Sequence, residues 1–164
     1  MNVSVSKTKG LMRVAAVDIL LIGLMIIVPT VSHALSFPLY KLNPMLLCLL
    51  AGMLIVRDHR NAFLLALLLP LVPMIVTGMP APAKSVCMIG ELLAIVGTYQ
   101  LFEKKMPVFL AMMSAILTGK VFYYLLKAVL ISPVALVGTE WWMQLAVVTV
   151  WCGLFSFISV RRRR

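Results

Sequence analysis

The fold class is decided by two neighbouring apolar segments, SVCMIGELLAIVGTYQLF at 85–102 and PVFLAMMSAILTGKVFYYLLKAVLI at 107–131. Their lengths are close to the roughly 20 apolar residues that an α-helix needs to cross a lipid bilayer. Each segment nevertheless contains ionisable side chains, Glu91 in the first and Lys120 and Lys127 in the second. A charge at bilayer depth is costly unless it faces a partner or a watery cavity. These three residues are therefore candidates for a functional site.

The rest of the chain has the same apolar character. Of its 164 residues 63% are hydrophobic, and the mean hydropathy is +1.08. A water-soluble domain of this composition could not cover its surface with polar groups. We therefore predict an all-α integral membrane protein, a single domain over residues 1–164 that forms a compact bundle of six transmembrane helices. The predicted spans are about 14–32, 39–56, 61–77, 85–102, 107–131 and 142–160.

Two of these spans are short and contain prolines. The second is interrupted near its start by Asn43-Pro44, and the third contains Pro70 and Pro73. Helices that are kinked or tilted and packed in protein tolerate such residues, because neighbouring groups satisfy the freed backbone atoms.

The basic residues are distributed unevenly between the predicted loops. With the N-terminus inside, the inner segments hold 11 of the 15 Lys and Arg residues and the outer segments hold only Lys41 and Lys84. The positive-inside rule then places both termini in the cytoplasm. The formal net charge of +10 is thus a signal of membrane topology, and we expect contact with the bilayer rather than with nucleic acid.

A cleaved signal peptide is an alternative for the N-terminus. Lys7, Lys9 and Arg13 precede the first apolar run, and Ser32-His33-Ala34 has the small-x-small form of a cleavage site. Cleavage would leave five spans and oppose the charge rule, and Asp18 inside the run is unusual for a signal. We therefore favour six spans.

The candidate pocket residues follow helical spacing on the fourth and fifth predicted spans. Glu91 lies about two turns below the outer end of its helix, at a depth between Lys120 and Lys127 of the next helix, which runs outward. Ammonium groups beside tyrosines suit a carboxylate or phosphate on an apolar or ring-bearing molecule. The candidate substrate-binding residues are Lys84, Glu91, Lys120, Tyr123, Tyr124, Lys127 and Trp141.

Each of these residues also has a structural interpretation. Glu91 and Lys120 could form an interhelical ion pair, with Lys127 extending to the interface. A mixed case would place Lys120 in the pair and leave Lys127 to meet the ligand. For Trp141 and its neighbour Trp142, an interfacial aromatic belt is the favoured role.

The first predicted span carries a small-residue patch. Ala15, Ala16 and Gly23 could allow another helix to pack closely, and they are the candidate residues for docking a partner. On the same span, Asp18 could pair locally with Arg13 or contact a partner subunit, and local pairing is favoured.

Several kinds of chemistry have no motif in this sequence. Cys48, Cys87 and Cys152 lie in apolar segments without CxxC spacing, and His33 and His59 are isolated. There is no GxxxxGK[ST] phosphate loop and no GxSxG nucleophile motif. We therefore expect no enzyme activity, no metal and no cofactor, and no ATP hydrolysis by this chain.

Three short motifs carry a family resemblance. They are GMPAP at 78–82 in an outer loop, GEL at 90–92 in the following helix and TGK at 118–120 in the next. With the length, the six spans and the inside termini, they resemble the substrate-binding S components of energy-coupling factor (ECF) vitamin transporters. Two departures are that the Ala-x-x-x-Ala docking pattern of the first helix is incomplete, and that Lys120 stands where an Arg is expected.

The resemblance implies a function and a set of partners. It implies capture of a vitamin-like small molecule from outside the bacterial cytoplasmic membrane, and association with a membrane coupling subunit and two ATPase subunits. It places the pocket in the outer halves of the later helices. The alternative function is a structural scaffold of a cell-envelope assembly, similar to MreD. A scaffold predicts that Glu91 and Lys120 pair with each other and that no cavity reaches the outer face.

Overall fold

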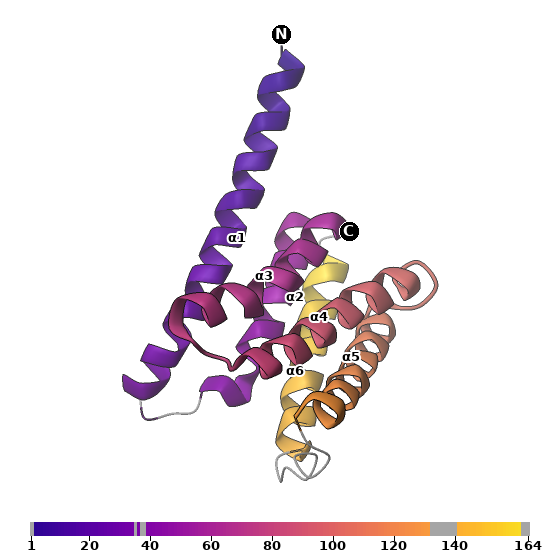
Figure 1. Ribbon diagram of the computed structural model, residues 1–164. Coiled ribbons are helices and arrows are strands. Elements are labelled where there is room, and N and C mark those ends of the chain that lie inside the picture. Colours follow the sequence, from indigo (N-terminus) through magenta and orange to yellow (C-terminus); the bar gives the residue numbers. More distant parts are fainter. Residues whose placement is uncertain (1, 35, 37–38, 132–140, 162–164) are drawn as a thin grey trace.

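The computed structural model describes residues 2–34, 36, 39–131 and 141–161, and this part of the chain contains helices and no strand. Every predicted span contains a helix, so the all-α prediction is confirmed. The elements are α1 (Asn2–Ala34), the 3₁₀ turn η1 (Leu39–Leu42), α2 (Pro44–Val56), α3 (His59–Thr77), α4 (Pro82–Phe102), α5 (Val108–Leu130) and α6 (Trp141–Arg161) (Figure 1).

Four of the described helices are long and apolar enough to cross a membrane, as judged by length and composition. They are the Gly10–Ser32 part of α1 and the helices α3, α4 and α5. The 13 residues of α2 rise only about 20 Å, which is less than the roughly 30 Å hydrocarbon core. Helix α6, with 21 residues at Trp141–Arg161, contains the whole predicted span 142–160. The structure is therefore that of a membrane protein with four candidate spans, and α2 is shorter than the predicted second span.

Local sequence explains where the helices begin and end. Asn43 adopts a left-handed conformation (φ 51°), and Pro44 follows as the first residue of α2, which separates η1 from α2 as the proline pattern predicts. The Asp58 side chain accepts a hydrogen bond from Arg60 N (3.0 Å) and caps α3. Because of this cap, α3 begins at His59 rather than at 61, and the third span is longer than predicted.

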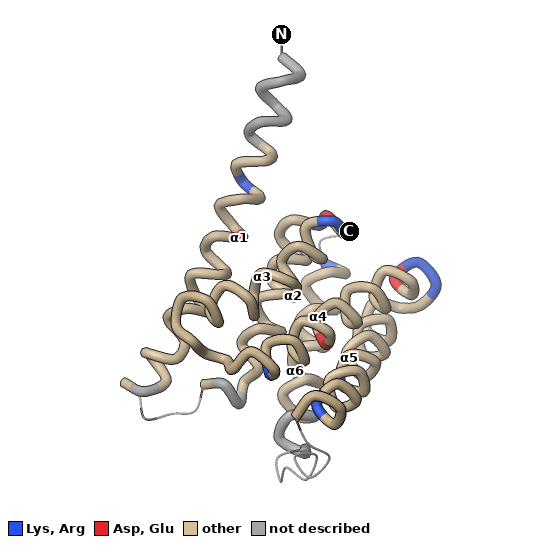
Figure 2. The backbone as a smooth tube through the Cα atoms, viewed as in Figure 1, with Lys and Arg blue, Asp and Glu red and all other residues tan. Residues whose placement is uncertain are grey.

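Most of the charged residues lie toward one end of the bundle (Figure 2). The α2–α3 and α4–α5 connections lie toward the same end as the C-terminal end of α6, and the N-terminal part of α1 projects beyond it (Figures 1 and 2). We call this the basic end; its residues include Arg57, Arg60, Lys104, Lys105 and Arg161. The α1–α2 and α3–α4 connections lie toward the opposite end.

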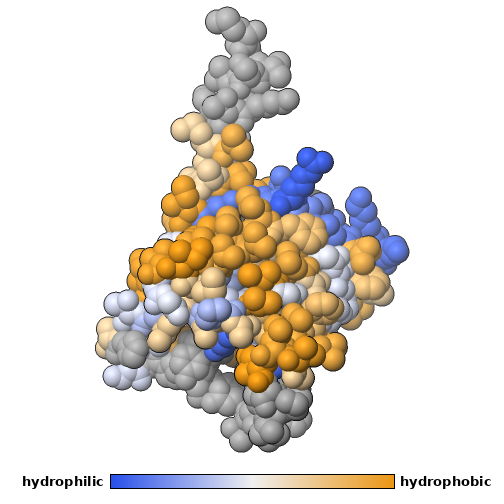
Figure 3. Space-filling view, in the orientation of Figure 1, coloured by the Kyte–Doolittle hydropathy of each residue, from blue (hydrophilic) through white to orange (hydrophobic). Residues whose placement is uncertain are grey.

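The bundle is apolar both inside and outside. Leu46, Leu65 and Ile95 are fully buried in one core that all six α-helices share. Large apolar side chains such as Ile19 and Val129 are exposed, and such residues cover most of the face seen in Figure 3. An apolar surface of this extent requires lipid or protein to cover it, as expected of a membrane protein.

Candidate functional site

Two glycines of the short sequence motifs bring α4 and α5 close together. A Cβ atom on Gly119 would lie 3.0 Å from the backbone oxygen of Glu91 and would clash with Ile95, and one on Gly90 would clash with Leu126. The α4–α5 contact is the most extensive between any two described helices. The absence of a side chain at Gly119 therefore allows the backbone of α5 to approach α4 at Glu91, one residue before Lys120.

This approach produces a buried ion pair. Lys120 Nζ lies 2.7 Å from Glu91 Oε1, and only 6% of the Glu91 side chain and 21% of the Lys120 side chain are exposed. The ammonium also lies over the ring of Tyr123, 5.7 Å from its centroid, and Tyr123 stacks edge-to-face on Tyr124 with centroids 5.4 Å apart. The interhelical pair considered from the sequence is thus formed.

The other predicted site residues are placed less closely together. Lys127 is half-buried in the last turn of α5, and Lys84 is exposed in the first turn of α4. The side chain of Trp141 lies outside the described part of the structure. Of the predicted set, the structure therefore brings Glu91, Lys120, Tyr123 and Tyr124 together; a ligand role for them stays a prediction.

A cavity of about 480 Å³ opens at the end opposite the basic end. Its walls come from α1, α2, α3, α4 and the α3–α4 connection, and they include the four methionines Met25, Met45, Met79 and Met88. Lys84 is the charged side chain among the described residues that line it. Of the predicted binding residues, Lys84 is the one that meets this cavity. Glu91 lies on a different part of α4, and Lys120, Tyr123, Tyr124 and Lys127 lie on α5.

The proline-containing connection 78–81 between α3 and α4 is fixed at both ends and borders this cavity. Gly78 takes the left-handed conformation (φ 72°) that ends α3. Met79 N donates to Thr77 Oγ1 (3.3 Å), and Ser85 Oγ donates to Pro80 O (3.2 Å). These bonds hold Met79, Pro80 and Ala81 where they line the cavity. The sequence motif therefore forms part of a cavity wall.

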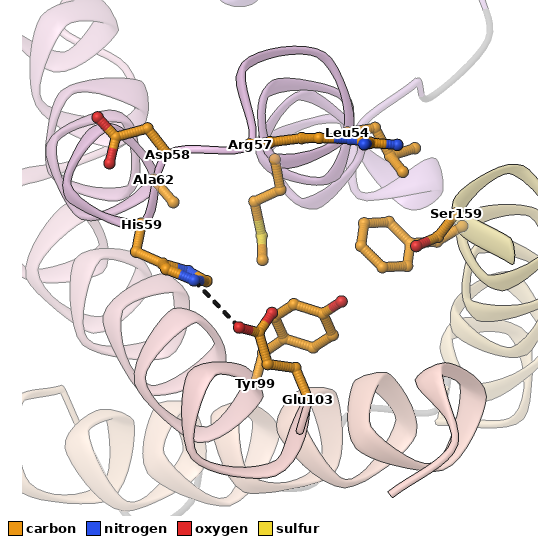
Figure 4. Close-up of a pocket in the computed structure, with 10 residues that line it drawn as sticks. Leu54, Arg57, Asp58, His59, Ala62, Tyr99, Glu103 and Ser159 are labelled. Carbon is orange, nitrogen blue, oxygen red and sulfur yellow. Dashed lines mark ion pairs between the residues drawn. The ribbon is translucent and has the colours of Figure 1, made fainter. Parts of the chain in front are cut away.

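A smaller cavity of about 170 Å³ lies at the basic end, among α2, α3, α4 and α6 (Figure 4). At its edge His59 Nε2 lies 3.0 Å from Glu103 Oε1, which links the start of α3 to the end of α4. Arg57, Tyr99 and Ser159 line the same space. Sequence reasoning treated His59 as isolated and missed this group. The signal available was that the start of α3 and the end of α4 must lie on the same membrane side.

The first helix is attached to the bundle by a polar contact. Asn61 Nδ2 of α3 donates to Asp18 Oδ1 of α1 (3.0 Å), and both residues are buried. From the sequence we favoured local pairing of Asp18 with Arg13. In the structure the hydrogen-bond partner of Asp18 is instead Asn61, on a different helix. Ala15 and Ala16 are exposed on the same helix. Gly23 is the third residue of the small-residue patch, and a Cβ atom added to it would meet no other atom within 4 Å. These positions are accessible to another helix.

No group of three potential metal ligands occurs among the described residues. No protein-family model, curated protein or solved structure matches this chain. The functional assignment therefore depends on the cavities, the charges and the sequence motifs described above.

Proposed function

We propose that this protein is the solute-binding membrane subunit of an ECF-type importer in the bacterial cytoplasmic membrane. The observation that carries the proposal is the cavity of about 480 Å³ next to the connection 78–81. Its volume falls within the roughly 300–1,000 Å³ of small-molecule sites. A scaffold has no need of a ligand-sized cavity at this end.

The lining favours a particular kind of solute. Methionine walls adapt to irregular apolar or ring-bearing molecules because the side chain is flexible and polarisable. Lys84 makes no ion pair with any residue in the described ranges, so its ammonium can meet a carboxylate or phosphate. We therefore propose an anionic or zwitterionic, vitamin-like substrate with an apolar body.

Concentrative uptake by this chain would need energy from elsewhere, because the sequence has no nucleotide-binding motif. We propose a membrane coupling subunit and two ATPases as partners, and no catalysis by this chain itself. Ala15, Ala16 and Gly23 are the proposed docking residues, since small side chains on an accessible helix allow close helix packing.

In this proposal the basic end faces the cytoplasm and the cavity opens outward. Single cysteines at Ala81 and Arg163, introduced in a cysteine-free background, test the orientation. A membrane-impermeant reagent added from outside should label position 81 and leave position 163 unlabelled. The reverse pattern would contradict the orientation and the proposed direction of transport.

The scaffold alternative is supported by one observation, the Glu91–Lys120 pair, which compensates both charges without a ligand. It is separated from the transport proposal by ligand binding. Thermal stability of the detergent-solubilised protein should be measured across a panel of vitamins and precursors. A ligand present at 100 times its Kd stabilises the native state by about 2.7 kcal/mol. A panel without any stabilising compound would favour the scaffold.

Matched lysine variants identify the binding site for any compound that stabilises the protein. Lys84→Met should lower affinity roughly tenfold by removing one charge-assisted contact at the cavity. Lys105→Met, at the basic end, is the control and should bind normally. Lys127→Met tests the site predicted on α5. If Lys127→Met alone lowers affinity, the ligand occupies the α4–α5 region instead of the cavity.

A further inference from the structure

The basic-end cavity places opposite charges on opposite sides. Arg57, at the end of α2, borders it on one side, and Glu103, after α4, borders it on the other (Figure 4). The Asp58 carboxylate points away from the space and caps α3 instead. A ligand in this cavity would therefore meet a guanidinium at one end and a carboxylate at the other.

The backbone at Arg57 is unfavourable for an arginine. Its φ of 56° and ψ of 24° are left-handed, and its N–H bonds to Met53 O at 3.3 Å as the cap of α2. Glycine is the usual residue at such a position because a Cβ atom is disfavoured there. The chain thus holds an arginine where the backbone favours glycine, and this conformation places its side chain on the cavity wall.

Two hydroxyl groups and an apolar floor complete the lining. Tyr99 and Ser159, both almost fully buried, come from α4 and α6, and Met53 and Phe155 form apolar wall between them. Tyr99 packs edge-to-face on Phe155, with ring centroids 5.6 Å apart, which fixes the position of the phenol. Hydroxyl donors beside a guanidinium suit phosphate oxygens.

The position of the cavity indicates the source of such a ligand. The basic end is where the charged loops gather, so it lies at the level of the lipid headgroups if the long apolar helices cross the bilayer. The cavity volume of about 170 Å³ is the volume that roughly five or six molecules occupy in liquid water. That is the scale of a phosphate joined to a short amine, and it is too small for a vitamin-sized molecule.

The geometry points to a binding site for a zwitterionic phosphoethanolamine headgroup at the basic end. Arg57, with the hydroxyls of Tyr99 and Ser159, takes the phosphate, and Glu103 accepts hydrogen bonds from the ammonium. A carboxylate has two oxygens and several acceptor sites, so Glu103 can keep its 3.0 Å contact with His59 while it meets the ligand. A simple anion fits less well because Glu103 would repel it. A choline headgroup has no N–H donor and needs more room.

The test compares three phospholipids with identical acyl chains, carrying ethanolamine, glycerol or choline headgroups. The full-length protein is delipidated in detergent, and lipid retention is measured by native mass spectrometry. The ethanolamine lipid should bind about tenfold more tightly than the other two, as expected for one added charge-assisted contact. Equal retention of all three lipids would overturn the inference.

Variants then assign the two ends of the headgroup. Glu103→Gln should remove the preference for ethanolamine over glycerol, because it weakens binding of the ethanolamine lipid and relieves the repulsion of the anionic glycerol lipid. Arg57→Met should weaken all three lipids, and Arg60→Met, a neighbouring exposed arginine outside the lining, is its control. His59→Gln breaks the same ion pair as Glu103→Gln but keeps the carboxylate, so the preference should survive. If His59→Gln and Glu103→Gln have the same effect, the pair is structural and the site assignment is wrong.

Free phosphoethanolamine tests whether the site recognises the headgroup alone or needs the whole membrane lipid. Displacement of the ethanolamine lipid by the free compound would show that the headgroup alone is recognised. Selective lipid binding without displacement would assign the site to the membrane lipid. Thermal unfolding of each variant confirms that a loss of binding does not reflect a loss of fold.

Discussion

Removal of Lys120 tests whether the Glu91–Lys120 pair stabilises the bundle. The Glu91 side chain is 6% exposed, so Lys120→Met would leave a carboxylate buried in an apolar bundle without its counter-ion. Breaking a buried pair in this way costs about 3–5 kcal/mol. For a chain of this size, each kcal/mol lowers the unfolding midpoint by about 2–4 °C. We expect Lys120→Met to lower the midpoint by roughly 6–20 °C.

The two single variants, Lys120→Met and Glu91→Gln, should lose different amounts of stability. Glu91→Gln leaves Lys120 unpaired, but the Lys120 side chain is already 21% exposed and its flexible stem can move the ammonium toward water. Its loss should therefore be clearly smaller than that of Lys120→Met. The double variant Glu91→Gln/Lys120→Met removes both charges and should recover most of the stability lost in Lys120→Met.

The assay is thermal unfolding in a single detergent, read as a double-mutant cycle. Lys84→Met, which removes an exposed lysine from the start of α4, controls for the general effect of losing one positive charge. If the losses of stability in the two single variants simply add in the double variant, the two residues are not energetically coupled and the argument is refuted. Equal losses in the two single variants would refute the argument from burial.

Three further changes test local packing and backbone. Gly119→Ala should cost about 1–3 kcal/mol because its Cβ meets α4, whereas Gly97→Ala, which has open space, should be neutral or stabilising in thermal unfolding. Asn61→Leu removes the hydrogen bond to buried Asp18 and should cost about 1–3 kcal/mol in the same assay. Arg57→Gly should raise the unfolding midpoint by relieving about 1–2 kcal/mol of left-handed backbone strain, yet lower retention of an ethanolamine lipid.

The helices were predictable because hydropathy is a local property of the sequence. The break at Asn43-Pro44 appears as predicted, since proline fixes the first turn of α2. The start of α1 at Asn2 instead of 14 was not predictable from hydropathy, because a polar segment can continue a helix beyond the apolar run. The length of α3 depends on the Asp58 cap, which an apolar window does not detect.

The contacts between distant residues were less predictable. Glu91 and Lys120 could be paired as an alternative because they lie on consecutive helices that run in opposite directions. Asp18 and Asn61 are 43 residues apart, and nothing in their local sequence indicates that α1 packs against α3. The His59–Glu103 contact likewise depends on how α3 and α4 pack.

Electrostatic compensation separates Lys84 and Lys120, which the sequence analysis listed together as candidate binding residues. The charge of Lys120 is balanced by Glu91 at 2.7 Å and by the face of Tyr123, so the folded chain already meets its electrostatic requirement. Lys84 lines a cavity without an acidic partner in the described ranges, so an anionic ligand would lower the free energy of its ammonium in that largely apolar space. A ligand gains more from an uncompensated charge than from one it must compete for. We therefore expect Lys84→Met to weaken ligand binding more than Lys120→Met does.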